Sequence, residues 1–269
     1  MTPAPGVDGP FLCHVRVLTT RAELDESADV WHALWTRCVG ARTPFLSFEW
    51  VRTWVQHFSG DGRLHVIVVE SAGAVVGIMP LVHVRYGFGP LALDALETPG
   101  GESRNLIALV DPGAEAAIAR AIAAHLAGEG LLGARVVRLM LVPSEHQFML
   151  QLLAALREVR PAVSARMTVC SFAPYAPLPA IWEDFEASLS RRRRRVLARS
   201  KRRMDLERKE VQVTQAHGAK IDGVMRRLFD LHDARWRQVG IRGLFHDERV
   251  RAFHLHVARE CERLGWLDL

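Results

Sequence analysis

The feature that most limits how this chain can fold is a run of basic residues between positions 191 and 209. Eleven of these 19 residues are Lys or Arg, and only Asp205 and Glu207 are acidic, so the segment carries +9. The whole chain of 269 residues carries +5, and the other 250 residues therefore sum to −4. The high isoelectric point is thus a local property. Arginines packed side by side repel one another unless something anionic lies against them.

Apolar residues in and before this run recur three, four and seven positions apart, which predicts a helix with a narrow apolar stripe. They are Phe185, Leu189, Val196, Leu197, Met204 and Leu206. No Gly or Pro interrupts 181–217, so a long helix is allowed. Either the helix is simply solvated, or it faces an anion: phosphates, an acidic polymer, an anionic membrane surface or an acidic patch of the fold. The candidate anion-binding residues are Arg191, Arg192, Arg193, Arg194 and Arg195.

The length and composition are those of a globular protein. A hydrophobic content of 49% over 269 residues is enough for one large or two modest domains. No apolar run approaches the roughly 18–20 residues needed to span a bilayer, and the N-terminus lacks the pattern of a secretory signal. Cys13, Cys38, Cys170 and Cys261 are far apart and form no CxxC pair. We therefore expect reduced thiols, a cytoplasmic location and no transmembrane segment.

The first part of the chain is expected to form an α/β domain over 13–173, after a loose leader at 1–12. Helices are predicted at 21–39, 47–58, 114–127 and 147–159, and strands at 64–70, 75–86, 105–110, 136–142 and 167–172. Ser47 is expected to cap the second helix. The first two strands flank a turn at 71–74, which predicts a hairpin. Pro80 lacks a backbone N–H and predicts an edge strand or a bulge at that point.

A linker at 174–180, marked by Pro174, Pro177 and Pro179, separates this domain from a mainly helical part at 181–269. A short strand is expected at 211–214, and helices at 220–239 and 247–264. The first of these helices should bury Ile221, Val224, Leu228, Leu231 and Trp236. The last residues, 266–269, read as the start of a buried strand. Because such helices would lack a sheet to pack against, we expect the second domain to be incomplete in this chain.

Motifs for metal, nucleophilic or phosphate-loop chemistry are missing. The sequence has no HExxH, GxSxG or GxxxxGK[ST]. His254 and His256 are two positions apart and would point about 200° apart on a helix. The only GxG, at Gly87 and Gly89, follows a strand without opening a helix and predicts a turn. We therefore expect no metal ion.

The segment LHDARW at 231–236 has two interpretations. His232 and Trp236 share one helical face. In the favoured structural interpretation Trp236 packs in a core, with His232 and Arg235 snorkelling or pairing with Asp233 or Glu248. In the functional interpretation the three residues form a pocket wall, with His232 as a base and Arg235 as an anion anchor.

Taken in order, four segments resemble one family. They are TPFLSFEWVRTWVQHF (43–58), VVGIMPLVHVRYGFGP (75–90), LSRRRRRVLARSKRRMDLERKEVQV (189–213) and LFDLHDARWRQVGIRGLFHDERVRAFH (228–254). Their order and spacing resemble the CelD-like, BioF-associated acetyltransferase-domain proteins, which are built as tandem GNAT-like folds and are related to the FemAB transferases. The resemblance covers nearly the whole chain.

The resemblance implies a GNAT-like N-terminal domain followed by the helical first part of a second, incomplete one. It also implies N-acyl transfer from acetyl-CoA or another acyl-CoA to an amine, with a small molecule or a polysaccharide or cell-envelope precursor as acceptor. The [RQ]xxGx[GA] loop that holds the CoA pyrophosphate in such folds is absent from this sequence. No cofactor residue therefore carries over, and the acyl-CoA site is expected beyond the present C-terminus.

Two other functions stay open at this point. One is a FemAB-like transfer from aminoacyl-tRNA, in which the basic helix would hold RNA phosphates. The other is a non-catalytic module that binds an anionic ligand or assembles with a partner. The sequence does not identify a catalytic base.

Overall fold

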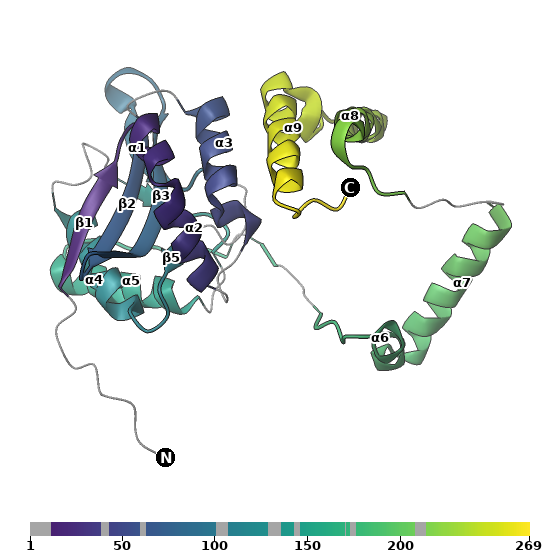
Figure 1. Cartoon of the computed structure of the whole chain (residues 1–269), viewed down its shortest axis with the longest axis horizontal. Helices are drawn as coiled ribbons and strands as arrows, with labels where there is room; N and C mark the ends of the chain where they lie inside the picture. The colour runs from purple at the N-terminus through teal and green to yellow at the C-terminus, as the bar shows by residue number, and fades with distance from the viewer. Residues whose placement is uncertain are drawn as a thin grey trace, which may run out of the picture.

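A computed structural model describes residues 12–38, 43–59, 63–100, 107–128, 136–142, 146–169, 171–172, 176–207 and 214–269. Over these residues the protein is mixed α/β, as the sequence predicted. One sheet is covered by helices on both faces, and four further helices follow it along the chain (Figure 1).

The sheet has six strands in the order β1-β2-β3-β4-β6, with β5 pairing on β3. The strands are β1 (Cys13–Leu18), β2 (Leu64–Ser71), β3 (Ala74–Tyr86), β4 (Leu93–Glu97), β5 (Leu109–Val110) and β6 (Val136–Arg138). Strands β1 to β4 are antiparallel, whereas β4 and β6 are parallel, with Glu97 beside Arg138 at their carboxyl ends. The intervening helix α4 (Glu115–Ala127) provides the crossover that parallel strands require.

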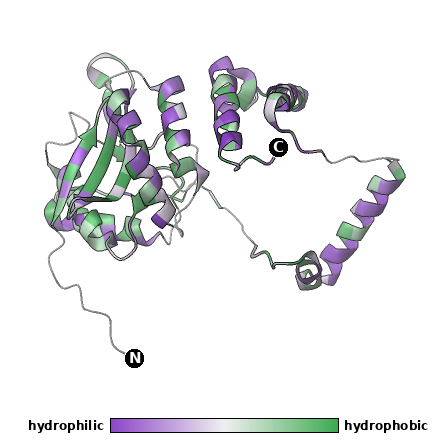
Figure 2. Ribbon diagram, viewed as in Figure 1, coloured by the Kyte–Doolittle hydropathy of each residue, from purple (hydrophilic) through white to green (hydrophobic). Residues whose placement is uncertain are grey.

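Successive side chains along a strand point to opposite faces of the sheet, so one hydrophobic core forms on each face. On one face Ile67, Met79 and Leu96 pack beneath α4 and α5 (Gln147–Val159). On the other face Val68, Ile78 and Val82 pack beneath three helices. These are α1 (Arg21–Glu26), α2 (Ala28–Arg37) and α3 (Phe48–Phe58). In Figure 2 the strands of the sheet are largely hydrophobic, and the helices around them carry both hydrophilic and hydrophobic residues.

Side-chain caps decide where the first helices begin and end. The helix predicted at 21–39 is two helices, because Ser27 ends α1 and its hydroxyl donates to the Leu24 carbonyl at 2.6 Å. The predicted cap at Ser47 is confirmed, since its hydroxyl accepts from the Trp50 N–H at 3.2 Å. Helices α4 and α5 agree with the predicted ranges within one residue.

The hairpin of β2 and β3 is confirmed, and Pro80 occupies a locally unpaired position on one side of β3, as the edge alternative predicted, rather than a bulge. Strand β3 pairs with β2 on one side and with β4 and β5 on the other, and the bulge lies between Val69 and Glu70. On the second side β5 reaches Ile78 and β4 begins at Val82. The N–H that Pro80 lacks therefore falls in the gap between two partner strands, where no ladder bond is lost.

Two other strand predictions were too long, and a third was wrong. Strand β6 ends at Arg138 and is half-exposed rather than buried, and β5 covers only Leu109–Val110. Residues 105 and 106 lie outside the described part. Residues 167–169 and 171–172 form no strand, and Phe172 is 88% exposed, because no partner strand lies beside them.

The long basic helix is also two helices. Helix α6 (Trp182–Ser188) and helix α7 (Arg191–Glu207) meet at Leu189 and Ser190, where Ser190 accepts the first helical hydrogen bonds of α7. Most of the strand predicted at 211–214 lies outside the described residues. Helices α8 (Ile221–Gln238) and α9 (Glu248–Arg263) then form a pair, with short 3₁₀ turns before each.

The C-terminal helices pack against α3 of the sheet domain, a contact that the sequence did not predict. Helix α9 lies against α3, where the Phe253 ring meets Trp50 at 5.0 Å and Phe58 at 5.3 Å. The strand expected at 266–269 is absent, and Trp266 instead stacks on Trp35 at 4.9 Å. The α8–α9 pair is thus anchored on the face of the sheet domain that α3 covers (Figure 1).

The buried face of α8 differs from the predicted one. Ile221 is buried as expected, but its buried neighbours are Met225 and Phe229. Val224, Leu228, Leu231 and Trp236 are 38%, 43%, 61% and 37% exposed. The helix offers two apolar stripes, and the side that meets α9 decides which one is covered.

Candidate functional site

The arrangement best suited to chemistry lies at the carboxyl ends of the parallel strands β4 and β6. Glu97 is the last residue of β4 and Arg138 the last residue of β6, and Tyr86 reaches them from the end of β3. The Tyr86 hydroxyl donates to Glu97 Oε1. Arg138 donates to the Tyr86 oxygen at 2.6 Å and to Glu97 Oε1 at 3.0 Å. We call these three residues the Tyr–Glu–Arg cluster.

Strand register brings the Tyr–Glu–Arg cluster together. Glu97 and Arg138 are neighbours in the parallel ladder. Tyr86 leans along β4 from its own partner, Leu93. Only 10% of the Glu97 side chain is exposed, against 45% for Arg138. The carboxylate is thus held inside the sheet edge, while the guanidinium and the phenol stay open to a ligand.

The ionisation of the cluster follows from these contacts. The hydrogen bond to Glu97 raises the pKa of Tyr86, because the carboxylate stabilises the protonated phenol, and burial adds to the effect. The charge of Glu97 likewise raises the pKa of Arg138. At neutral pH the cluster therefore offers a protonated phenol and a permanent cation around one carboxylate. Such a set can hydrogen-bond a polar substrate and pass a proton.

The predicted anion-binding residues Arg191 to Arg195 lie together on the first turns of α7 and are exposed. Among the described residues none of the five lies within ion-pair distance of an Asp or Glu. Arg194 donates to the Ala187 carbonyl at 3.0 Å, which ties α7 to the end of α6. A groove of about 630 Å³ at the corner of these helices has Arg192 and Arg193 on its wall.

The structure also brings His232 and Trp236 together on α8, as predicted. The indole Nε1 of Trp236 donates to His232 Nε2 at 2.9 Å, and the Phe245 ring lies 4.8 Å from the imidazole. Asp233 pairs with Arg251 from α9, which in turn contacts Glu248. Arg235 is exposed and takes no part. The pairing of His232 with Asp233 at 3.6 Å agrees with the structural interpretation, but Trp236 is 37% exposed rather than packed in a core.

Histidines gather in two other places. Buried His65 has its Nε2 3.2 Å from that of His125, with His83 beside it. Burial, with these two neighbours, lowers the pKa of His65 to about 4. At the α3–α9 contact His57 Nε2 lies 3.3 Å from His256 Nδ1. Within the described ranges no group of three or more His, Cys, Asp or Glu residues is arranged to hold a metal ion.

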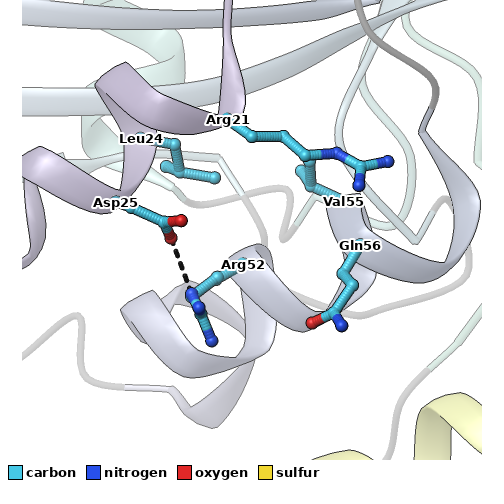
Figure 3. Close-up of a pocket in the computed structure, with 6 residues that line it drawn as sticks. All are labelled: Arg21, Leu24, Asp25, Arg52, Val55 and Gln56. Carbon is cyan, nitrogen blue, oxygen red and sulfur yellow. Dashed lines mark hydrogen bonds and ion pairs between the residues drawn. The ribbon is translucent and has the colours of Figure 1, made fainter.

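A smaller pocket of about 230 Å³ lies between α1 and α3 (Figure 3). It is lined by Arg21, Leu24, Asp25, Arg52, Val55 and Gln56. Arg52 Nε donates to Asp25 at 2.6 Å across the pocket, and Arg21 donates to the Ser59 carbonyl at 2.7 Å. The charged side chains of this pocket thus hold α1 against α3.

No family model matches the chain, and no curated protein matches it in a sequence search. Among the helices of the described residues, none combines the length and the apolar composition needed to cross a lipid bilayer.

The Tyr–Glu–Arg cluster was not predicted from the sequence. Tyr86, Glu97 and Arg138 belong to three strands and share no local motif. One signal was available, since each polar residue stands at the end of an apolar strand.

Proposed function

We propose that this chain acts in the cytoplasm in N-acyl transfer to an amine, and that the Tyr–Glu–Arg cluster handles the amine acceptor. The observation that carries the proposal is the convergence of a phenol, a carboxylate and a guanidinium on one face of β3, β4 and β6. The succession of four antiparallel strands, a crossover helix and a parallel strand also supports a GNAT-like sheet.

The described residues do not fit the pyrophosphate of CoA. The first turn of α4 carries Glu115, whose carboxylate accepts the Gly113 N–H at 2.9 Å. An acidic side chain at a helix N-terminus occupies the place that an anion would take. The sequence also lacks the glycine loop. No step through CoA is therefore assigned to this chain.

The chemistry of the acceptor follows from the three side chains. An incoming ammonium would lie against the Glu97 carboxylate, which accepts a proton and leaves the neutral amine free to attack the acyl carbon. The Tyr86 phenol stays protonated and can donate to the oxygen or the leaving group as negative charge develops. Arg138 holds Glu97 in place and carries the compensating positive charge.

The test is an acyl-transfer assay of the purified chain with a small acyl thioester that lacks the nucleotide part of CoA and a panel of amines, following release of free thiol. We expect acceptor-dependent release that Glu97→Gln lowers by about a hundredfold and Tyr86→Phe by about tenfold. Arg52→Gln is the matched control, because it removes an ion pair in the other pocket. Thiol release that never exceeds the acceptor-free rate, or that survives both cluster substitutions, overturns the proposal.

A further inference from the structure

The surface of α6 and α7 combines charge and apolar area in one place. Nine of the 17 residues of α7 are Lys or Arg and two are acidic, so this helix alone carries +7. Arg191, Arg195 and Arg199 are four residues apart and therefore lie along one side of the helix. Arg202 falls on the same side, since eleven residues are close to three turns.

The opposite side of α7 carries apolar residues, with Arg193 and Ser200 between them. Val196 and Met204 point about 80° from each other within this side and are 59% and 47% exposed. At the junction with α6, the groove of about 630 Å³ is lined by Trp182, Phe185, Leu189, Ser190, Arg192, Arg193, Val196, Leu197 and Ser200. Trp182 is itself 57% exposed. Both helices lie on the outside of the molecule, away from the sheet (Figures 1 and 2).

We propose that α6 and α7 form a docking surface for a bilayer that contains anionic phospholipid. A helix with basic residues on one side and apolar residues on the other lies in the plane of a membrane interface, with its apolar face between headgroups and acyl chains. The arginines then reach lipid phosphates, which a planar guanidinium binds in bidentate fashion. Trp182 stands where indole rings favour the interface.

An anionic bilayer is the partner that matches both the positive charge and the exposed apolar residues of this surface. A polyanion such as RNA would satisfy Arg191, Arg195 and Arg199, but it would leave Trp182 and Val196 in water. At an anionic bilayer the apolar side enters the interface, and the flanking Arg192, Arg194 and Lys201 can reach lipid phosphates. Arg191, Arg195 and Arg199 then add attraction to the negative surface potential. Since no helix of the described residues crosses a bilayer, the binding through this surface is peripheral. The inference does not rest on acyl transfer, because the Tyr–Glu–Arg cluster lies in another part of the fold.

The test measures co-sedimentation of the full chain with vesicles of phosphatidylcholine and phosphatidylglycerol in roughly a 2:1 ratio, beside pure phosphatidylcholine vesicles. We expect binding to the anionic vesicles only. The variant R191Q/R195Q/R199Q/R202Q should bind about 600-fold more weakly, since each of the four cations near the surface contributes about fivefold. The variant V196S/M204S should lose about tenfold by removing apolar contact.

The matched control is L228S/L231S, which removes exposed apolar residues from α8 and should leave vesicle binding unchanged. An unchanged circular dichroism spectrum shows that each variant is folded. Two results overturn the proposal. One is failure to bind the anionic vesicles at low salt. The other is a pair of observations: the chain binds homopolymeric RNA through these arginines, and V196S/M204S binds vesicles as well as the unaltered chain does. In that case α7 would be a nucleic-acid surface.

Discussion

At the scale of the residue, His65 links folding to pH. Its imidazole is fully buried, and its pKa is about 4 in the folded chain against 6.5 for an exposed histidine. A lowered pKa means that the unfolded chain binds the proton more readily. The contribution of His65 to stability is therefore complete above pH 6.5 and is lost as the pH falls toward 4. The shift corresponds to about 3 kcal/mol.

Urea denaturation between about pH 7 and about pH 4.5 tests this linkage. The unaltered chain should lose most of those 3 kcal/mol over this interval. The variant His65→Gln should lose much less, because glutamine does not titrate; His83 and His125, whose pKa values are also lowered by burial, account for the remainder. Equal pH dependence in both proteins would show that His65 is already charged or exposed in the folded state.

At the scale of the element, two glycines of the C-terminal helices should respond to alanine in opposite directions. A Cβ at Gly243 would lie 2.5 Å from Cε1 of His232 and 3.0 Å from Cδ1 of Trp236. Because the His232 ring is held by Trp236 and Phe245, it can give way only by breaking those contacts. Gly223 lies inside α8 with nothing within 4 Å of such a Cβ.

We expect Gly243→Ala to lower the free energy of unfolding by about 1–3 kcal/mol. Gly223→Ala should raise it by about 0.5–1 kcal/mol, since alanine favours the helix. Denaturant midpoints compare the two directly. If Gly243→Ala proves as stable as Gly223→Ala, the turn before α9 is not in close contact with the His232 ring.

The same scale shows what local sequence can predict. Helices α4, α5, α8 and α9 were found within one or two residues, because their periodicity and the cap at Asp247 are local. The break at Ser190 was missed because nothing but a side-chain cap marks it. The choice between the two stripes of α8 depends on α9, and the Tyr–Glu–Arg cluster depends on strand register. The buried stripe of α8 and the Tyr–Glu–Arg cluster are both determined by tertiary contacts, so no local sequence pattern predicts them.

At the scale of the whole molecule, the contact between α3 and α9 joins the two parts of the chain. Phe253 is the centre of this contact, because it is 4% exposed and meets rings of Trp50, His57 and Phe58. Arg249 adds a guanidinium 5.2 Å from the centre of the Phe58 ring. The stack of Trp35 on Trp266 is a second, smaller attachment. Removing the Phe253 ring should therefore release α9 while the sheet stays folded.

Truncating a buried phenylalanine to alanine costs about 3 kcal/mol or more. If that loss falls on the docking of α9, amide exchange in α9 should rise by about a hundredfold in Phe253→Ala, because exchange follows the population of the open form. Exchange in β2, at the centre of the sheet, should not change. Leu231→Ala removes a side chain that is 61% exposed and should alter neither region. Faster exchange in β2 as well would mean that the sheet and the C-terminal helices unfold as one cooperative unit, in which α3 and α9 share a single core.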